Sequence, residues 1–440
     1  MTRFEPPASV TARRAEGRDL RDRCHRADQG RFKPPGARPD LSARLKAAVA
    51  GRQPAILPLR WARMAESPFR FYRGTAALMA ADLHGLPTAG LEVAACGDAH
   101  LLNFGAYADP DGGLVFDLND FDESCSGPFE WDLKRLAASF MLAGREAGQG
   151  DGACKDAIHA LARAWREALH GFAELPLREL ARVEVRPQDG HKPLDPIFEQ
   201  AARDTPAKLL AKATAPDGTG YSRFLTKLPG LRPLDDGEAA LILDAWPSYL
   251  ASLGPRSRQV AEGYHPYDFA HRAAGCGSLG VRDYLVLCYA AGPGDPLFLE
   301  FKSQPGSCWR PTPIGAHRGR EVAENVQRLQ AWSDPCLGWA TLDGAPFLVR
   351  QWSDHKASIE VESLSGESLG HYAVLCGRVL AQAQARSGDA ARLSGYAGHA
   401  EKLDTAMAEF AEVYADQATR DFEAFKAAIA RGEFETSSWV

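Results

Sequence analysis

The sequence has no long apolar run, no paired cysteines and no excess of basic residues, and each absence argues against a class of protein. No stretch approaches the ~20 consecutive apolar residues of a membrane-spanning helix, and no targeting segment is visible. The nine cysteines are scattered without a C-x-x-C pair, so neither a disulfide framework nor a zinc site is indicated. A net charge of -6 argues against nucleic-acid binding, which uses basic faces. Together these features predict a cytoplasmic protein with neither nucleic-acid nor membrane partners.

The remaining composition is that of an ordinary intracellular enzyme. The chain has 440 residues, of which 45% are hydrophobic and 25% are charged. A chain of this length and composition can bury a large core and is long enough for two or three lobes.

Acidic and amide side chains concentrate between residues 96 and 135. Residues 91–96 read as a short buried strand, after which Gly97 lets the backbone turn sharply and present Asp98 at the strand end. Asn103 follows after a four-residue spacer, a loop length that can bring its amide back toward Asp98. A second strand near residues 113–116 then leads to Asp120 and Asp122. We expect these side chains to converge on one point.

Carboxylates that lie this close repel one another unless a cation neutralises them, and hard oxygen ligands of this kind suit magnesium. Phosphoryl transfer uses such a set: an Asp in a D-x4-N loop accepts the proton of the attacking hydroxyl, while the Asn and a second Asp hold the metal. The pattern predicts Asp98 as the base and Asn103, Asp120 and Asp122 as metal ligands. His100 either orients the loop or touches a phosphate. The competing interpretation is that these residues only stabilise turns, since Asp and Asn are common in loops after strands.

A family resemblance is carried by the same residues. Residues 97–103, G-D-A-H-L-L-N, resemble the catalytic loop HGDxHxxN of aminoglycoside phosphotransferases and choline kinases. Residues 119–123 resemble their metal-binding I-D-F-D/E segment, and residues 127–133 resemble the following G-D-P-x-x-D-L-A stretch. The resemblance implies ATP and Mg2+ as cofactors and a structural, helix-anchoring role for Asp132. Cys96 stands where that family has histidine.

The nucleotide-binding features of such a kinase lie downstream. Residues 1–90 contain no glycine-rich hairpin, whereas residues 275–280 read G-C-G-S-L-G, a G-x-G-x-x-G pattern. Strands are expected at 284–289 and 297–302, and a helix at 320–333. The phosphate-covering loop and the Lys–Glu ion pair of kinases are then assigned to Gly275, Gly277, Ser278, Gly280, Lys302 and Glu324.

Alternatives remain for several of these residues. A dinucleotide-binding fingerprint needs a strand before the glycines and a helix after them, and here the order is reversed. Glu321 lies one helical turn from Glu324 and competes with it for the ion pair. Arg73 is aimed either at a phosphate or at a carboxylate such as Asp132, and structural pairing is favoured.

The expected fold is α+β: a protein kinase-like bilobal fold in circularly permuted order, with a mostly helical large lobe. The catalytic motifs come first and the nucleotide-binding β-lobe comes later. A hairpin of residues 337–342 and 346–351 around Asp343-Gly344 would complete the β-lobe. The chain also resembles, from Arg60 to Phe425, a bacterial family known as domain of unknown function 2252, whose name implies no substrate.

Four segments follow from this order. We predict a partly flexible arm at residues 1–40, a helical catalytic lobe at 41–270 with its catalytic and metal loops at 96–135, a nucleotide-binding β-rich lobe at 271–356, and C-terminal helices at 357–440 that pack on the catalytic lobe. Residues 184–270 are expected to be an accessory, mostly helical region.

The leading functional hypothesis is an ATP- and Mg-dependent phosphotransferase that acts on an unknown, small-molecule acceptor. A nucleotidyl transferase or an ATP-sensing protein without phosphotransfer is the alternative. A metallophosphoesterase is disfavoured because only the G-D-x-H part of its pattern is present. A non-catalytic interaction protein would leave the surplus of acids unexplained. The sequence does not indicate an oligomeric state.

Overall fold

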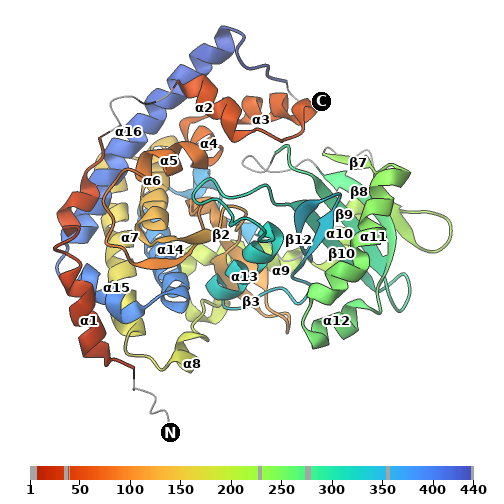
Figure 1. Ribbon diagram of the computed structural model, residues 1–440, viewed down its shortest axis with the longest axis horizontal. Coiled ribbons are helices and arrows are strands. Elements are labelled where there is room, and N and C mark those ends of the chain that lie inside the picture. Colours follow the sequence, from red (N-terminus) through yellow and green to blue (C-terminus); the bar gives the residue numbers. More distant parts are fainter. Residues whose placement is uncertain are drawn as a thin grey trace.

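A computed structural model describes residues 7–33, 38, 40–225, 230–272, 279–352 and 357–437. Helices and strands are mixed along the chain, so the α+β class is confirmed. In Figure 1 most of the helices gather on one side and a six-stranded sheet lies on the other. We call the described parts of residues 206–352 the sheet half and the rest the helical half.

The helices are α1 Val10–Asp19, α2 Leu41–Ala48, α3 Leu57–Met64, α4 Pro68–Arg73, α5 Ala76–Leu83, α6 Glu130–Glu146, α7 Asp151–Phe172, α8 Leu177–Leu180, α9 Asp195–Arg203, α10 Pro206–Ala213, α11 Asp236–Ser252, α12 Pro255–Ala261, α13 Arg318–Leu329, α14 Glu367–Ser387, α15 Ala390–Ala397 and α16 Lys402–Ala430. The strands are β1 Glu92–Ala95, β2 Phe104–Ala108, β3 Leu114–Leu118, β4 Cys125–Pro128, β5 Thr214–Pro216, β6 Ser222–Phe224, β7 Leu231–Pro233, β8 His265–Arg272, β9 Asp283–Tyr289, β10 Pro296–Ser303, β11 Gly338–Leu342, β12 Ala345–Gln351 and β13 Ala357–Ser358.

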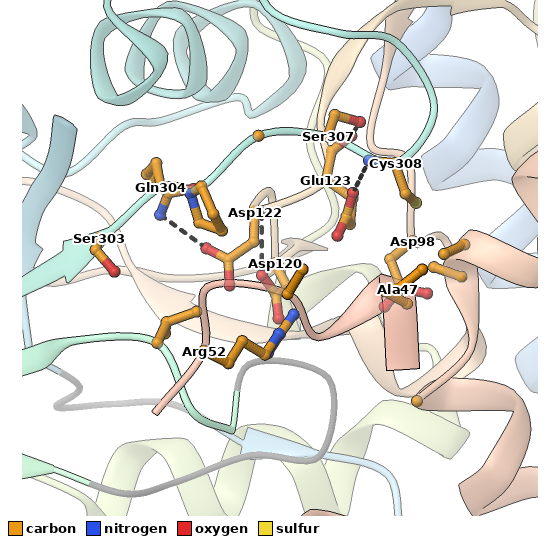
Figure 2. A pocket seen from close by; sticks show the side chains of 18 of the residues that line it. Ala47, Arg52, Asp98, Asp120, Asp122, Glu123, Ser303, Gln304, Ser307 and Cys308 are labelled. Atoms are coloured by element: carbon orange, nitrogen blue, oxygen red, sulfur yellow. Dashed lines mark hydrogen bonds between the residues drawn. The ribbon is translucent and has the colours of Figure 1, made fainter. Parts of the chain in front are cut away.

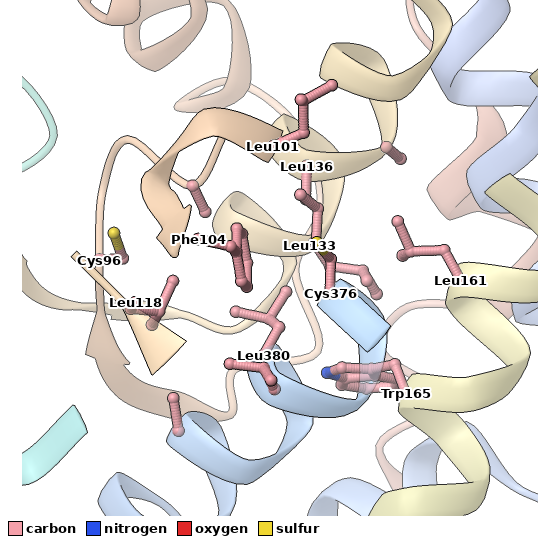
Figure 3. Close-up of a cluster of buried hydrophobic side chains, with 14 of the residues drawn as sticks. Cys96, Leu101, Phe104, Leu118, Leu133, Leu136, Leu161, Trp165, Cys376 and Leu380 are labelled. Carbon is pink, nitrogen blue, oxygen red and sulfur yellow. The ribbon is translucent and has the colours of Figure 1, made fainter. Parts of the chain in front are cut away.

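The helical half is built on α6, α7, α14 and α16, which share one buried core. Part of that core is shown in Figure 3, where Leu133 of α6 and Trp165 of α7 lie near Leu380 of α14. The backbones of α7 and α14 approach closely at Gly377, where a Cβ atom would lie only 2.3 Å from the backbone oxygen of Leu161. Glycine is therefore required at this crossing.

The sheet half contains six antiparallel strands in the order β11-β12-β10-β9-β8-β7. Alternate residues of a strand point to opposite faces. Phe301 of β10 packs against Tyr249 of α11, with ring centroids 5.6 Å apart, so α11 covers one face. Glu300 and Lys302 point to the other face, which meets the helical half because Lys302 contacts Asp122.

Two small antiparallel pairings place the acidic loops side by side. Strand β1 pairs with β4, with Ala95 opposite Cys125, and β2 pairs with β3, with Phe104 opposite Leu118. The loop between β1 and β2 and the loop between β3 and β4 therefore leave from paired strand ends. This register explains why carboxylates 20 or more residues apart meet, as the sequence predicted.

Several predicted elements are confirmed, with boundary changes that have local causes. The hairpin of β11 and β12 turns at Asp343 (φ 48°) and Gly344 (φ 71°), the positive angles that an Asp-Gly turn supplies. The helix expected near 196–213 is split into α9 and α10 at Pro206, which cannot donate a backbone hydrogen bond. The sheet extends beyond the predicted range 271–356, because β7 and β8 belong to it.

The N-terminal segment 1–40, expected to be a partly flexible arm, is structured over much of its described length. Helix α1 packs against α15, where Arg13 forms an ion pair with Asp389 at 3.0 Å and Arg14 donates to Ser394. Within the described ranges, no helix combines the length and apolar character needed to cross a membrane.

The α7–α14 crossing gives a test of the fold. Gly377→Ala should lower the free energy of unfolding by about 1–3 kcal/mol or more, because the added methyl group overpacks a backbone contact. Gly370→Ala in the same helix is the matched control, since a Cβ there meets nothing within 4 Å. Higher helix propensity should leave its stability unchanged or raise it by up to about 1 kcal/mol. Chemical denaturation measures both, and equal stabilities of the two variants would contradict the close crossing.

Candidate active site

The loop that follows β1 is held by Asp132 at the start of α6. Its two carboxylate oxygens accept hydrogen bonds from the backbone N–H groups of Cys96 at 2.7 Å and Gly97 at 2.9 Å. The Cys96 thiol donates to the backbone oxygen of Asp120 at 3.0 Å. Cys96 thus links the two acidic loops at the position where the resembling kinases have histidine. Asp132 orders the loop backbone, as the resemblance implied.

Asp98 is presented by the turn at Gly97 and lines a cavity. Its Oδ1 accepts a hydrogen bond from Nε of Arg135 at 2.6 Å, and Arg135 is fully buried above the ring of Tyr72. Its Oδ2 lies 3.9 Å from Nε2 of His100. Burial raises the pKa of Asp98 to about 6, against the smaller, lowering effect of Arg135. One oxygen is thus fixed by Arg135, while the other can exchange a proton near neutral pH.

His100 lies beside Asp98 and is 3% exposed. Burial lowers the pKa of His100 well below its ordinary value, and the charges of Arg73 and Arg135 lower it further, so the ring is neutral. Nε of Arg73 lies 3.4 Å from Nε2 of His100. Nδ1 has no hydrogen-bond partner among the described residues. His100 is not one of the described cavity-lining residues, so its catalytic role stays a prediction.

Asn103 and Asp120 have oxygens suited to a metal. Nδ2 of Asn103 donates a hydrogen bond to the backbone oxygen of Asp98, and this bond fixes the orientation of the Asn103 side-chain amide. Asp120 lines the cavity, and within the described ranges no Lys or Arg forms an ion pair with it. Its Oδ1 accepts a hydrogen bond from the backbone N–H of Asp122 at 3.3 Å. Carboxylate and amide oxygens are ligands that Mg2+ prefers, so the donor chemistry of both residues fits the predicted metal. Asn103 is not among the described cavity-lining residues, and its role as a ligand stays a prediction.

Asp122 joins the acidic loops to the sheet half. Its Oδ2 forms an ion pair with Nζ of Lys302, and its Oδ1 accepts from Nε2 of Gln304 at 3.1 Å. Arg318 donates to its backbone oxygen at 2.8 Å. Burial acts to raise the pKa of Asp122, but Lys302 and Arg350 outweigh it and lower the pKa to about 2. Asp122 is therefore ionised and held by Lys302; its role as a metal ligand stays a prediction.

The predicted ion pair between Lys302 and Glu324 is wrong, because Lys302 pairs with Asp122 instead. Glu324 lies on an exposed part of α13 and pairs with Arg320 at 2.8 Å. Glu321, the competing residue, pairs with Arg318 at 3.0 Å. The buried face of α13 carries its apolar residues, and Glu324 falls on the other face. Glu324 is thus not part of the cavity wall in the described residues.

The glycine-rich segment is described only at its end. Gly275, Gly277 and Ser278 lie outside the described residues, and their phosphate-covering role stays a prediction. Gly280 has φ 93°, and its backbone oxygen accepts from the backbone N–H of Gln53 at 2.7 Å. The chain before α3 thus lies against the end of the glycine segment.

The cavity has a volume of about 510 Å³ and is lined from both halves of the molecule. In Figure 2 the loop 303–308 passes on one side of Asp120 and Asp122, while Arg52 lies on the other. Its charged lining residues are Asp98, Asp120, Asp122, Glu123, Arg52, Arg60 and Arg73. The cavity therefore combines acids with arginines, and the proposed pairing of Arg73 with Asp132 is wrong, since Asp132 holds backbone N–H groups.

Sequence reasoning missed Arg135 and the loop 303–308. Arg135 follows Asp132 by three residues in α6, and this helical spacing was a usable signal that both face the catalytic loop. The loop 303–308 has no such signal. It matters because Ser307 donates to the backbone oxygen of Glu123 and Gln304 donates to Asp122, contacts that exist only in the folded chain.

Comparison with known proteins identifies a family but no characterised relative. Residues 52–428 match the family model described as "Uncharacterized protein conserved in bacteria (DUF2252)". No curated protein and no solved structure matches the chain. The matched residues include every predicted site residue.

The turn at Gly97 gives a test of the site's construction. Gly97 has φ 81°, and a Cβ there would lie 2.2 Å from the backbone oxygen of Glu123. Gly97→Ala should lower the free energy of unfolding by about 2 kcal/mol or more, through backbone strain and the clash. Gly112→Ala, with φ 83° and nothing within 4 Å of the added methyl, should cost only about 1 kcal/mol. Denaturation curves compare them, and equal losses would show that Glu123 does not press on the turn.

Proposed function

The chain belongs to the DUF2252 family of bacterial proteins, and from the geometry of its cavity we propose that it is an ATP- and Mg-dependent phosphotransferase acting on a small molecule. One observation carries the proposal. Lys302, at the end of β10, contacts Asp122, 180 residues away in the sequence, beside the Asp98–Asn103 loop and Asp120. Asp98, Asp120 and Asp122 line one cavity, and the buried Lys302, which is not among its described lining residues, reaches this set through Asp122. A lysine next to a base and metal-binding carboxylates is the arrangement that phosphoryl transfer uses.

The order of elements supports a kinase-like fold in permuted order. Strand β8 leads into the glycine segment, and β9, β10 with Lys302, α13, β11 and β12 follow. Lys302 is thus on the third strand of this run, the position of the phosphate-binding lysine in protein kinases. The catalytic loop lies earlier in the chain, after β1. The nucleotide-binding lobe would be the sheet half, and the C-terminal residues 357–440 would return to the catalytic lobe.

Each residue of the site then has a task. The acceptor hydroxyl would lie at Oδ2 of Asp98, since Oδ1 is fixed by Arg135. As the hydroxyl oxygen bonds to the γ-phosphorus, its proton passes to Oδ2 and the bond from that phosphorus to the β–γ bridging oxygen breaks, which releases ADP. Lys302 would hold the phosphates of the nucleotide.

Asn103 and Asp120 would hold Mg2+, whose chemistry is to neutralise charge on the phosphate oxygens. Asp122, which lines the cavity, holds Lys302 through their ion pair. Asp132 and Cys96 keep the catalytic loop against the Asp120 loop. The environments of the two carboxylates thus move their pKa values in opposite directions. The raised pKa of Asp98 suits proton transfer, whereas the lowered pKa of Asp122 keeps that residue charged.

Binding of Mg-ATP is the first test. A ligand that binds the folded state stabilises it by about 2.7 kcal/mol at roughly 100 times its Kd, so Mg-ATP should raise the thermal midpoint. Asp120→Ala should abolish most of this rise. Asp98→Asn, which keeps an oxygen for Arg135, should retain the rise while slowing transfer by about 10²–10⁴-fold. Asp111→Ala, at an exposed turn, is the matched control and should behave as the parent.

Two outcomes would redirect the proposal. A parent protein whose midpoint does not move with Mg-ATP would exclude phosphotransfer, nucleotidyl transfer and ATP sensing together. Incubation of a metabolite extract with labelled ATP, followed by mass spectrometry, separates the first two: a product gaining a nucleotidyl group in place of a phosphoryl group would identify a nucleotidyl transferase.

The pKa of Asp98 predicts the pH dependence. Only the ionised carboxylate accepts a proton, so kcat/KM for the acceptor found in the extract should be level above about pH 7 and fall about tenfold per pH unit below pH 6. Initial rates between pH 4.5 and 8 measure this, and circular dichroism at each pH separates it from unfolding. An acid limb centred near pH 4 would show that Asp98 is not the base in the environment described.

A further inference from the structure

Three arginines line the cavity together with the acids, and all come from the N-terminal part of the helical half. Arg52 precedes α3, Arg60 lies within α3, and Arg73 ends α4. Nη1 of Arg52 donates to the backbone oxygen of Leu279 at 2.8 Å, next to the glycine segment. Arg52 is therefore on the side where the proposed nucleotide phosphates would lie.

Arg73 lies on the other side of the site, near the proposed base. Its Nε is 3.4 Å from Nε2 of His100, and that nitrogen is 3.9 Å from Oδ2 of Asp98. Within the described part of the chain, Arg73 forms no ion pair with a carboxylate. His100 is neutral and cannot compensate its charge. Arg73 thus lines the cavity beside His100, which in turn lies beside Asp98, and it has no partner of opposite charge among the described residues.

The first turn of α5 adds donors at the same place. Ala76 and Ala77 both line the cavity, and the first N–H groups of a helix have no acceptor within it. The hydroxyl of Thr75, the residue before the helix, donates back to the oxygens of Phe71 and Tyr72, so it does not cap these groups. A helix N-terminus beside an arginine is a favourable environment for an oxyanion.

We propose that the acceptor carries an oxyanion, a carboxylate or a phosphate monoester, which binds Arg73 and the first turn of α5 while its hydroxyl group lies at Asp98. The assignment of this anion site to the acceptor rests on the proposed phosphotransfer. Arg60 supports the site by donating to the backbone oxygen of Gly74 at 2.7 Å, which fixes the chain between Arg73 and α5. Aminoglycosides and choline are cations, so the acceptor differs in charge from those of the resembling kinases.

Inorganic phosphate is the probe for the anion site. The full-length protein, saturated with magnesium and a non-hydrolysable ATP analogue to fill the nucleotide side, is titrated with phosphate by isothermal calorimetry. The parent should bind phosphate, and Arg73→Gln should weaken binding about tenfold or more, as expected for loss of a charge-assisted hydrogen bond. Arg70→Gln is the matched control: it removes the same charge from the same helix, at an exposed residue that pairs with Glu66, and should change the Kd less than about twofold.

The outcomes separate the two proposals. Thermal stabilisation by Mg-ATP without phosphate binding would overturn the anion site and leave phosphotransfer standing. Phosphate binding that Arg73→Gln does not weaken would also overturn it, because the ion would then lie elsewhere. Phosphate binding that depends on Arg73 in a protein that ignores Mg-ATP would keep the anion site and remove its role in phosphotransfer. Arg73→Lys, which keeps the charge, should recover part of the affinity and shows that the Gln variant failed through charge and not folding.

A panel of acceptors tests the chemistry directly. With labelled ATP, hydroxy acids and phosphate monoesters that carry a free hydroxyl should give phosphorylated products, and amino alcohols and aminoglycosides should not. Transfer to the cationic set with none to the anionic set would overturn the assignment.

Discussion

The ion pair between Lys302 and Asp122 is the contact on which the candidate site depends, because it joins the sheet half to the acidic loops. Lys302 is 4% exposed, so its charge needs a partner. Removal of one partner from a buried ion pair costs about 3–5 kcal/mol in proteins, since the other charge remains buried. Gln304 and Arg318 add hydrogen bonds to the same residue. The sheet half is therefore fixed to the acidic loops at Asp122.

A concentration of carboxylates is tolerated because three of them have different forms of compensation. Asp122 has Lys302, Asp132 has two backbone N–H groups, and Asp98 has Arg135 on one oxygen only. Asp120 has no ion-pair partner within the described ranges. Asp98 is therefore the carboxylate with an oxygen that can exchange a proton, and Asp120 is the one whose charge is available to a cation. Opposite pKa shifts at Asp98 and Asp122 are the electrostatic consequence of that arrangement.

The parts of the site that sequence predicted are those determined by local chain geometry. A glycine after a buried strand and paired strand ends are enough to bring Asp98, Asn103, Asp120 and Asp122 together, because strand register determines where loops begin. The predicted ion pair of Lys302 with Glu324 is wrong because packing determines which face of α13 is buried. The sequence separation between Lys302 and Glu324 carries no information on that packing. Arg135 and the loop 303–308 depend on tertiary contacts in the same way. The arginines of the N-terminal segment reach the cavity only because α3, α4 and α5 fold over it.

The 180-residue separation between Asp122 and Lys302 has a consequence for synthesis of the protein. Domains generally fold as units, from the N-terminus first, while the chain leaves the ribosome. The acidic loops therefore emerge before the strand that carries their lysine, and α14 and α16, which complete the core of the helical half, emerge after it. Until the sheet docks, the charge of Asp122 lacks Lys302. Docking of the sheet is the step that neutralises this charge. The candidate site is thus completed late in translation, because its lysine and the last helices of the core beneath it are made after its acids.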